Sequence, residues 1–163
     1  YKMSRIMRNY GQSDRYEIKV NGLNSRLDEI QAAVLFERIK WLEKFTLTRR
    51  AIAECYNTKI QNDCIRKLDL PIEPENHVYH LYVILTNYRE ELIEHLLRDG
   101  IQSLIHYPVL ANEQEPSLML KTDPNGLQHA RRHAKTCLSI PCHHNLSQSN
   151  LNTIVDSINN FRA

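Results

Sequence analysis

Residues 22–35 read GLNSRLDEIQAAVL, and this stretch decides how the chain can fold. Gly22 and Asn24 are typical of a turn, and the apolar positions after them recur every three or four residues, as on one helix face. Ser25 is a candidate N-cap, because Asp28 follows three residues later, where a carboxylate is favourable near a helix N-terminus. The stretch predicts a turn that leads into a long helix.

The predicted helix carries apolar residues over a broad face. They form two neighbouring series: Leu27, Ile30, Val34, Trp41 and Phe45, and Ala32, Leu35, Ile39 and Leu42. A surface helix needs only a narrower stripe, so we expect this helix to be covered on more than one side. Another subunit or a further part of the protein would supply the cover. A second helix is expected at about residues 48–61.

The flanking segments alternate between helix and strand patterns. Helices are expected at residues 3–9, 87–100, 127–136 and from an N-cap at Ser147 onward, and extended stretches at residues 16–20, 77–86, 101–107 and 138–141. Pro71 and Pro74 predict a connector at residues 67–76. This order favours an α+β layer structure, with long N-terminal helices and a small, mostly antiparallel sheet flanked by helices.

Composition narrows the classes of function. The 163 residues carry a net charge of +2, too small to predict nucleic-acid binding. Residues 1–26 hold six basic and two acidic groups, a local excess that suits a phosphate or another anion, although a solvated helix face would have the same charge pattern. No apolar run is long enough for a membrane span and no secretory signal is present, so we expect a cytoplasmic protein.

The cysteines and motifs point to no self-contained active site. Cys55, Cys64, Cys137 and Cys142 are expected to be reduced thiols. The cluster of Cys137, Cys142, His143 and His144 matches no standard zinc spacing, and no metal is expected. Glycine-rich nucleotide loops and a G-x-S-x-G elbow are absent from the sequence. His106 stands at the end of an expected strand, where it could face a pocket or simply pack.

Several motifs, taken in order, resemble one enzyme family. They are RNYG at residues 8–11, the stretch at 22–35, YHLYVI at 79–84, HYP at 106–108 and LSIP at 138–141. In this order they resemble the DegT/DnrJ/EryC1/StrS family of pyridoxal-phosphate-dependent nucleotide-sugar aminotransferases. The resemblance covers nearly the whole chain, and the block at 22–35 is its most specific part.

The resemblance implies a fold type I transferase, in which a large α/β domain precedes a small C-terminal domain in a homodimer with shared active sites. This chain resembles only the C-terminal part. Residues 1–66 would be an arm and long helices that link from the large domain, and residues 67–163 the small α+β domain. In the family the lysine that binds pyridoxal phosphate lies upstream of the RNYG motif, before Tyr1 in this numbering. We therefore expect no catalysis from this chain alone.

The resemblance also implies roles for four residues. Asn24 and Arg26 would reach across the dimer interface toward the cofactor phosphate of the partner's site, and a guanidinium suits that contact. His106 and Tyr107 would line the side that receives the nucleotide sugar. The chain departs from the family's usual pattern after Pro108, which affects substrate contacts.

Three functions remain open from the sequence. The first is an aminotransferase of polysaccharide or deoxyamino-sugar biosynthesis that takes glutamate as donor and a keto-deoxy nucleotide sugar as acceptor. The form NSRLDE at residues 24–29 favours a 3-keto over a 4-keto sugar. The second is a sugar dehydratase of the same family, in which the cofactor lysine is replaced. The third is a non-catalytic dimerisation or binding module. In each case the broad apolar helix face predicts a homo-oligomer, and the resemblance implies a dimer.

Overall fold

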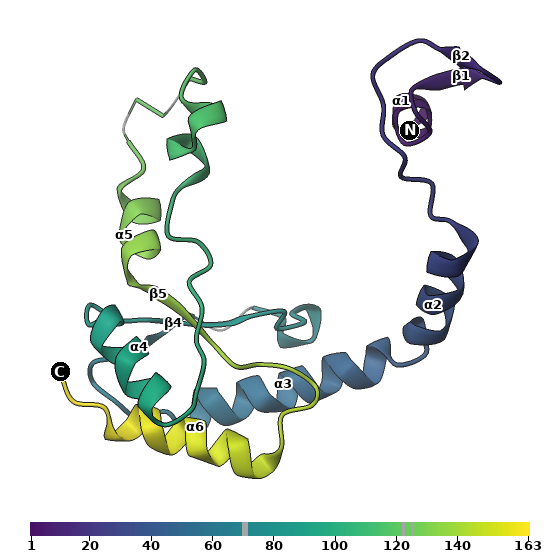
Figure 1. Ribbon diagram of the computed structural model, residues 1–163. Helices are drawn as coiled ribbons and strands as arrows, with labels where there is room; N and C mark the ends of the chain where they lie inside the picture. Colours follow the sequence, from purple (N-terminus) through teal and green to yellow (C-terminus); the bar gives the residue numbers. More distant parts are fainter. Residues whose placement is uncertain (70–71, 122, 125) are drawn as a thin grey trace. The chain divides into compact units, whose positions relative to one another are not determined.

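The computed structural model describes residues 1–69, 72–121, 123–124 and 126–163 (Figure 1). The chain divides into two compact units, residues 1–42 and 43–163. The domain division expected after residue 66 stays a prediction for the whole protein. Pro71, part of the expected connector, lies outside the described residues.

The first unit contains a short helix, a hairpin and a longer helix. Its elements are α1 (Lys2–Met7), β1 (Gln12–Asp14), β2 (Glu17–Ile18) and α2 (Glu29–Ile39), and the two strands pair antiparallel. The expected helix near residues 3–9 and the extended stretch near residues 16–20 are confirmed in type, with shorter bounds.

The helix after the turn begins later than expected. Asp28 is the N-cap of α2, and its amide donates to Gln31 Oε1 at 3.2 Å. The N-cap expected at Ser25 is wrong, because the Ser25 amide donates to the Arg8 carbonyl at 2.8 Å and so holds the turn extended beside that motif. The single long helix is also wrong: α2 ends at Ile39, and α3 (Leu42–Lys59) starts as a separate helix.

The second unit packs helices against a three-stranded antiparallel sheet of order β3-β4-β5. Besides α3, its elements are β3 (Arg66–Lys67), η1 (Pro74–Asn76), β4 (Tyr82–Leu85), α4 (Arg89–Arg98), η2 (Ala111–Glu113), η3 (Glu115–Ser117), α5 (Gln128–Thr136), β5 (Cys137–Ile140) and α6 (Gln148–Asn160). β4 and β5 pair with Ile84 opposite Leu138. The predicted α+β class is confirmed.

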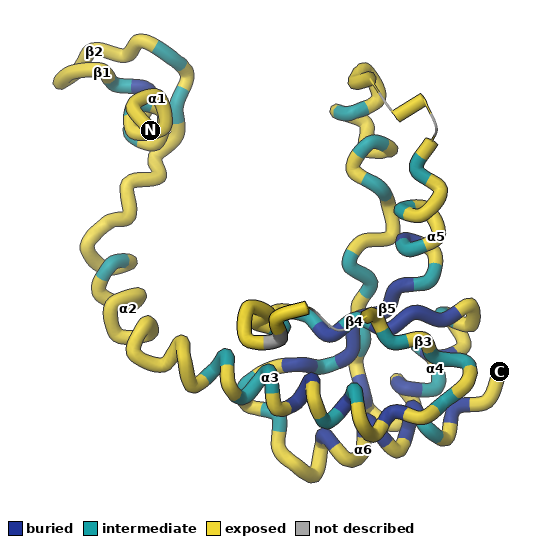
Figure 2. The backbone as a smooth tube through the Cα atoms, turned by 180° about the vertical axis from the view of Figure 1, so that it is seen from behind, coloured by how far each residue is buried: buried dark blue, intermediate teal, exposed yellow. Residues whose placement is uncertain are grey.

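One core holds this unit together. The buried cluster draws on β4 and β5 (Tyr82, Ile84, Leu138, Ile140) and on three helices (among others Ile52 and Tyr56 of α3, Leu92 and Leu96 of α4, and Leu151, Ile154 and Ile158 of α6). The strand residues in this cluster alternate along their strands, so one sheet face is turned toward the helices. Figure 2 shows the buried backbone gathered in these elements.

Two expected strands are shorter than the alternation suggested. The strand expected at 77–86 is reduced to β4. Arg49 Nη1 donates to the carbonyls of Tyr79 and His80 at 3.3 and 3.0 Å, so these carbonyls bind a side chain and not a neighbouring strand. The strand expected at 101–107 is wrong except for one bridge, in which Leu104 pairs with Ser139.

The ends of α3 and α6 are joined by side-chain amides. Asn62 Nδ2 donates to the carbonyls of Ile158 and Phe161 at 2.7 and 2.9 Å. In return, Asn159 Nδ2 donates to the Lys59 carbonyl at 2.9 Å, and Asn159 Oδ1 accepts from the Gln61 amide at 2.7 Å. Carbonyls at both helix ends, which have no intrahelical partner, are satisfied in this way.

Candidate functional site

The turn that carries Asn24 and Arg26 is bound to the RNYG motif. Arg8 Nε donates to the Ser25 carbonyl at 2.8 Å, and Arg8 Nη2 donates to the Arg26 carbonyl. Backbone bonds extend this contact, since the Tyr10 amide donates to the Leu23 carbonyl at 2.9 Å. Arg8 therefore positions the backbone of Arg26, and the Tyr10–Leu23 bond holds the residue before Asn24.

Two glycines allow a close approach between backbone segments of the arm, which is residues 1–27 before α2. A Cβ on Gly11, whose φ is +78°, would lie 1.7 Å from the Val20 carbonyl oxygen. A Cβ on Gly22 would lie 2.1 Å from the Gly11 nitrogen. Any side chain at either position would push the turn away from the RNYG motif, so the pair of glycines is a geometric requirement for this turn.

Asn24 and Arg26 both lie exposed on the first unit. Asn24 forms an antiparallel bridge with Asn9, and the Arg26 guanidinium lies 5.6 Å from the centre of the Tyr10 ring. Arg26 Nε is 3.4 Å from Asp28 Oδ1. A guanidinium and a side-chain amide two residues apart are donors that fit a phosphate, although the Asp28 carboxylate competes for Arg26.

His106 is fixed to the sheet, whereas Tyr107 is not. His106 Nδ1 lies 3.0 Å from Ser139 Oγ on β5, and the backbone of Leu104 pairs with the same serine. The Tyr107 side chain is 72% exposed and its ring meets the His106 ring edge-on. The bond at Nδ1 orients the imidazole and leaves Nε2 for another partner, while the tyrosine ring is open to a ligand or another chain.

One buried hydroxyl close to this histidine has no partner. Ser103 Oγ is out of contact with water and makes no hydrogen bond among the described residues. Such a group is costly in a folded protein unless something outside the chain satisfies it. Ser103 therefore adds a polar group to the segment that leads into His106.

The cysteines and histidines near the C-terminus pack separately. Cys142 is buried, and burial raises the pKa of its thiol to about 11. The His144 ring stacks on Phe45 at 3.8 Å between centroids. Within the described ranges, no three His, Cys, Asp or Glu residues converge on a metal position, and no helix is both long and apolar enough to cross a membrane.

The structure groups the predicted site residues in pairs. Asn24 and Arg26 share one turn of the first unit, and His106 and Tyr107 share one segment of the second unit. Sequence reasoning missed the positioning roles of Arg8 and Ser139. Arg8 had a signal, since it begins the RNYG motif, whereas nothing in the sequence links Ser139 to a histidine 33 residues earlier.

Comparisons with known proteins agree in family and fold. The model of the DegT/DnrJ/EryC1/StrS aminotransferase family matches residues 1–159. The chain is 31% identical over 156 residues to dTDP-3-amino-3,6-dideoxy-alpha-D-galactopyranose transaminase of Aneurinibacillus thermoaerophilus, covering 96% of this chain and 42% of that protein. It is 34% identical over 157 residues to dTDP-3-amino-3,4,6-trideoxy-alpha-D-glucose transaminase of Streptomyces venezuelae, covering 94% of this chain and 41% of that protein.

A solved structure is similar to this chain in sequence and in fold. S. venezuelae DesV in complex with a ketimine intermediate is 32% identical, with a TM-score of 0.80, and the match covers 95% of this chain and 42% of that one. The likeness confirms the fold implied by the resemblance, that of the C-terminal part of a pyridoxal-phosphate-dependent transferase. The chain thus spans less than half the length of the relatives it matches.

Proposed function

Because this chain belongs to the DegT/DnrJ/EryC1/StrS aminotransferase family, we propose that it is part of a pyridoxal-phosphate-dependent aminotransferase for a nucleotide-linked keto sugar. The observation that carries the proposal is the family match over residues 1–159, together with two relatives named as transaminases of dTDP-linked amino sugars. When bound, pyridoxal phosphate supplies the electron sink that amino transfer requires.

The arm binds the cofactor phosphate. Asn24 and Arg26 supply an amide and a guanidinium. Arg8 holds the carbonyls of residues 25 and 26, and the bridge to Asn9 holds the backbone of Asn24. The exposure of both side chains supports a role toward a group outside this unit. A turn whose backbone is already held loses less conformational entropy on binding than a mobile turn would.

The apolar face of α2 supports the assignment to an oligomer. Exposed side chains on this helix include Ile30 (82% exposed), Val34, Leu35, Phe36 and Ile39. An apolar surface of this kind marks an interaction site. A second copy of the protein covers this face in a homodimer, and the arm of each copy then reaches the cofactor of the other.

The second unit receives the sugar. His106 is oriented by Ser139, and Tyr107 offers an exposed aromatic face and a hydroxyl. A sugar presents hydroxyl groups and apolar ring faces, and this pair of side chains is suited to bind both.

The test is made on the full protein as its gene encodes it. We expect borohydride treatment followed by intact-mass measurement to show a pyridoxyl adduct, and amino transfer from glutamate to a dTDP-linked 3-keto sugar. Dehydration without amino transfer would instead identify a dehydratase. A protein of 19.2 kDa without adduct would identify a non-catalytic module and overturn the proposal.

A matched pair of variants tests the arm. Arg26→Gln is expected to weaken pyridoxal phosphate binding about tenfold or more, the loss expected for a charge-assisted hydrogen bond. Arg15→Gln changes an equally exposed arginine of the β1–β2 hairpin and is expected to leave the affinity unchanged. Equal affinities in the two variants would contradict the assignment of Arg26.

A further inference from the structure

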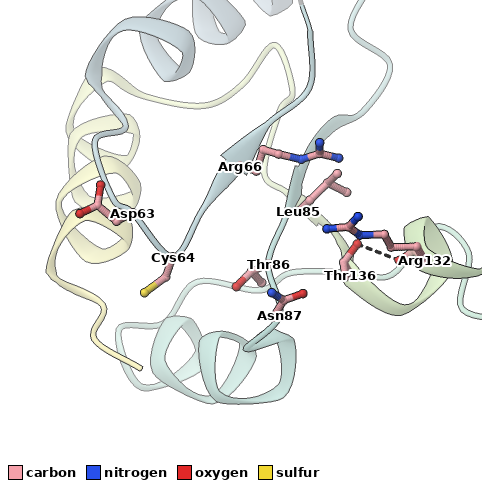
Figure 3. A pocket seen from close by; sticks show the side chains of 8 residues that line it. All are labelled: Asp63, Cys64, Arg66, Leu85, Thr86, Asn87, Arg132 and Thr136. Carbon is pink, nitrogen blue, oxygen red and sulfur yellow. Dashed lines mark hydrogen bonds between the residues drawn. The ribbon is translucent and has the colours of Figure 1, made fainter. Parts of the chain in front are cut away.

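A polar pocket lies on the second unit at the edge of its sheet. Its lining comes from the turn between α3 and β3, from β3, from the end of β4 and the two residues after it, and from α5 (Figure 3). Its polar and charged side chains come from Asp63, Arg66, Thr86, Asn87, Arg132 and Thr136. None of the four site residues predicted from the sequence lines it.

The two arginines of this pocket differ from the other arginines of the unit. Residues 43–163 contain eight arginines, and six of them have a partner: Arg49, Arg50, Arg89, Arg98 and Arg162 bind backbone carbonyls, and Arg131 pairs with Glu113. The guanidinium groups of Arg66 and Arg132 have no hydrogen bond or ion pair with any described residue. The two unpartnered arginines thus share one pocket.

The lining of the pocket carries a net positive charge, because it holds two arginines and one aspartate. Asp63 is the single acidic residue of the lining, and Figure 3 shows its carboxylate apart from both guanidinium groups. Arg89, whose Nη1 donates to the Ala134 carbonyl at 2.7 Å, adds no net charge nearby, because its Nε pairs with Glu90 Oε1 at 3.2 Å. Like charges gathered in this way repel one another, and a bound anion relieves that repulsion.

The remaining lining supplies neutral hydrogen-bonding groups. The buried Thr86 hydroxyl accepts from the Tyr88 amide at 3.1 Å and keeps its own proton for another acceptor. The Asn87 side-chain amide has no partner among the described residues, and Thr136 Oγ1 donates to the Arg132 carbonyl at 2.9 Å. The neutral donors left for a ligand beside the two arginines are therefore Thr86 and Asn87, both in the segment after β4.

The size of the pocket limits the ligand. Its volume is about 150 Å³, below the roughly 300–1,000 Å³ of sites that enclose drug-sized molecules. A nucleotide sugar is too large for it, whereas a single tetrahedral oxyanion fits. A planar guanidinium group binds a phosphate through two parallel hydrogen bonds, and a tetrahedral phosphate has enough oxygens to accept from two such groups at once.

We propose that this pocket is a binding site for a phosphate group, held by the guanidinium groups of Arg66 and Arg132. The phosphate is either inorganic phosphate or the terminal group of a small phosphate ester. The site is independent of Asn24 and Arg26, which the proposed function assigns to the cofactor. Its occupancy neutralises the repulsion between β3 and α5 and so stabilises this edge of the unit.

Calorimetric titration of the full protein, saturated with pyridoxal phosphate and held at constant ionic strength, tests the proposal. We expect saturable binding of one equivalent of inorganic phosphate. Arg66→Gln and Arg132→Gln are each expected to weaken phosphate binding at least tenfold. Arg66→Lys keeps the charge but not the planar pair of donors, and it is expected to weaken binding less than Arg66→Gln does. Glycerol 3-phosphate in a parallel titration separates an ester from free phosphate.

Two control variants make the result specific. Arg131→Gln changes the neighbouring arginine, which pairs with Glu113, and Arg26→Gln changes the proposed cofactor contact; both are expected to leave phosphate binding unchanged. Hydrogen exchange is expected to slow on phosphate addition in peptides that cover residues 63–66, 85–87 and 132–136. Absence of saturable binding, or binding that Arg26→Gln or Arg131→Gln weakens as much as Arg132→Gln does, would overturn the proposal.

Discussion

The two compact units differ in how they use their apolar residues. In residues 1–42, all of which are described, Gly11 is the one buried residue, whereas every residue of the core cluster lies in residues 43–163. The helices α2 and α6 have the same kind of apolar periodicity, yet α2 has no buried residue and α6 buries Leu151, Ile154 and Ile158. Periodicity shows which helix face must be covered, but not which molecule covers it.

The largest expected difference in stability is between substitutions of two leucines, one in each unit. Leu96→Ala removes a fully buried side chain of α4 and is expected to lower the free energy of unfolding by about 2–5 kcal/mol. Leu35→Ala, on the exposed face of α2, is expected to change it by less than about 0.5 kcal/mol in dilute solution and to weaken self-association instead. Urea denaturation and sedimentation measure the two effects, and equal destabilisation would mean that α2 is packed within the chain itself.

Two glycines with similar backbone angles sharpen the comparison. Gly100 ends α4 with φ +75° and has open space at its Cβ position, so Gly100→Ala is expected to cost about 1–2 kcal/mol of strain. Gly11→Ala adds a clash with the Val20 carbonyl to the same strain. We expect Gly11→Ala to abolish amide protection in residues 7–25, measured by hydrogen exchange. The urea midpoint of the second unit is expected to stay unchanged. Protection that survives Gly11→Ala would contradict the tight packing of the arm.

Alkaline pH is expected to weaken the second unit. Burial raises the pKa of Cys142 from its ordinary value of 9.0 to about 11 and raises the pKa of Tyr56 as well. Between these values the unfolded chain loses the thiol proton and the folded chain keeps it, so the free energy of unfolding falls as the pH rises from about 9 to 11. Urea denaturation across this range measures the slope. Cys142→Ala is expected to reduce it, and an unchanged slope would exclude Cys142 as a cause.

The smallest expected difference separates the two helix N-caps. Ser147 Oγ accepts from the Asn150 amide at 3.1 Å at the start of α6, so Ser147→Ala is expected to cost about 1 kcal/mol of global stability. Asp28→Ala at the start of the exposed α2 is expected to reduce helix content locally without moving the urea midpoint. Circular dichroism and denaturation together distinguish these outcomes, and a global loss from Asp28→Ala would place α2 in the cooperative core.

Local signals in the sequence predicted the elements that depend on local interactions. The N-cap at Ser147 and the helix end at Gly100 were predicted because capping and a left-handed residue need only neighbouring groups. The predictions at Ser25 and at residues 101–107 failed because distant backbone partners, near Arg8 and at Ser139, decide those conformations.

The candidate site shows the same limit. Asn24, Arg26, His106 and Tyr107 came from motifs, and their roles stay predictions. The pair of Arg66 and Arg132 carries no motif at all. The two arginines are separated by 66 positions in the sequence. They line one pocket because β3 and α5 both border it, and no periodicity or spacing in the sequence predicts that arrangement.

The amide contact between the ends of α3 and α6 makes the packing of these helices sensitive to deamidation. Asn62 serves as a double donor to two carbonyl oxygens, a role that only its NH₂ group can fill. Deamidation would replace that group by a carboxylate oxygen, which would face the same carbonyls as a repelling acceptor. Replacement of one NH₂ group by oxygen would thus separate the ends of the two helices.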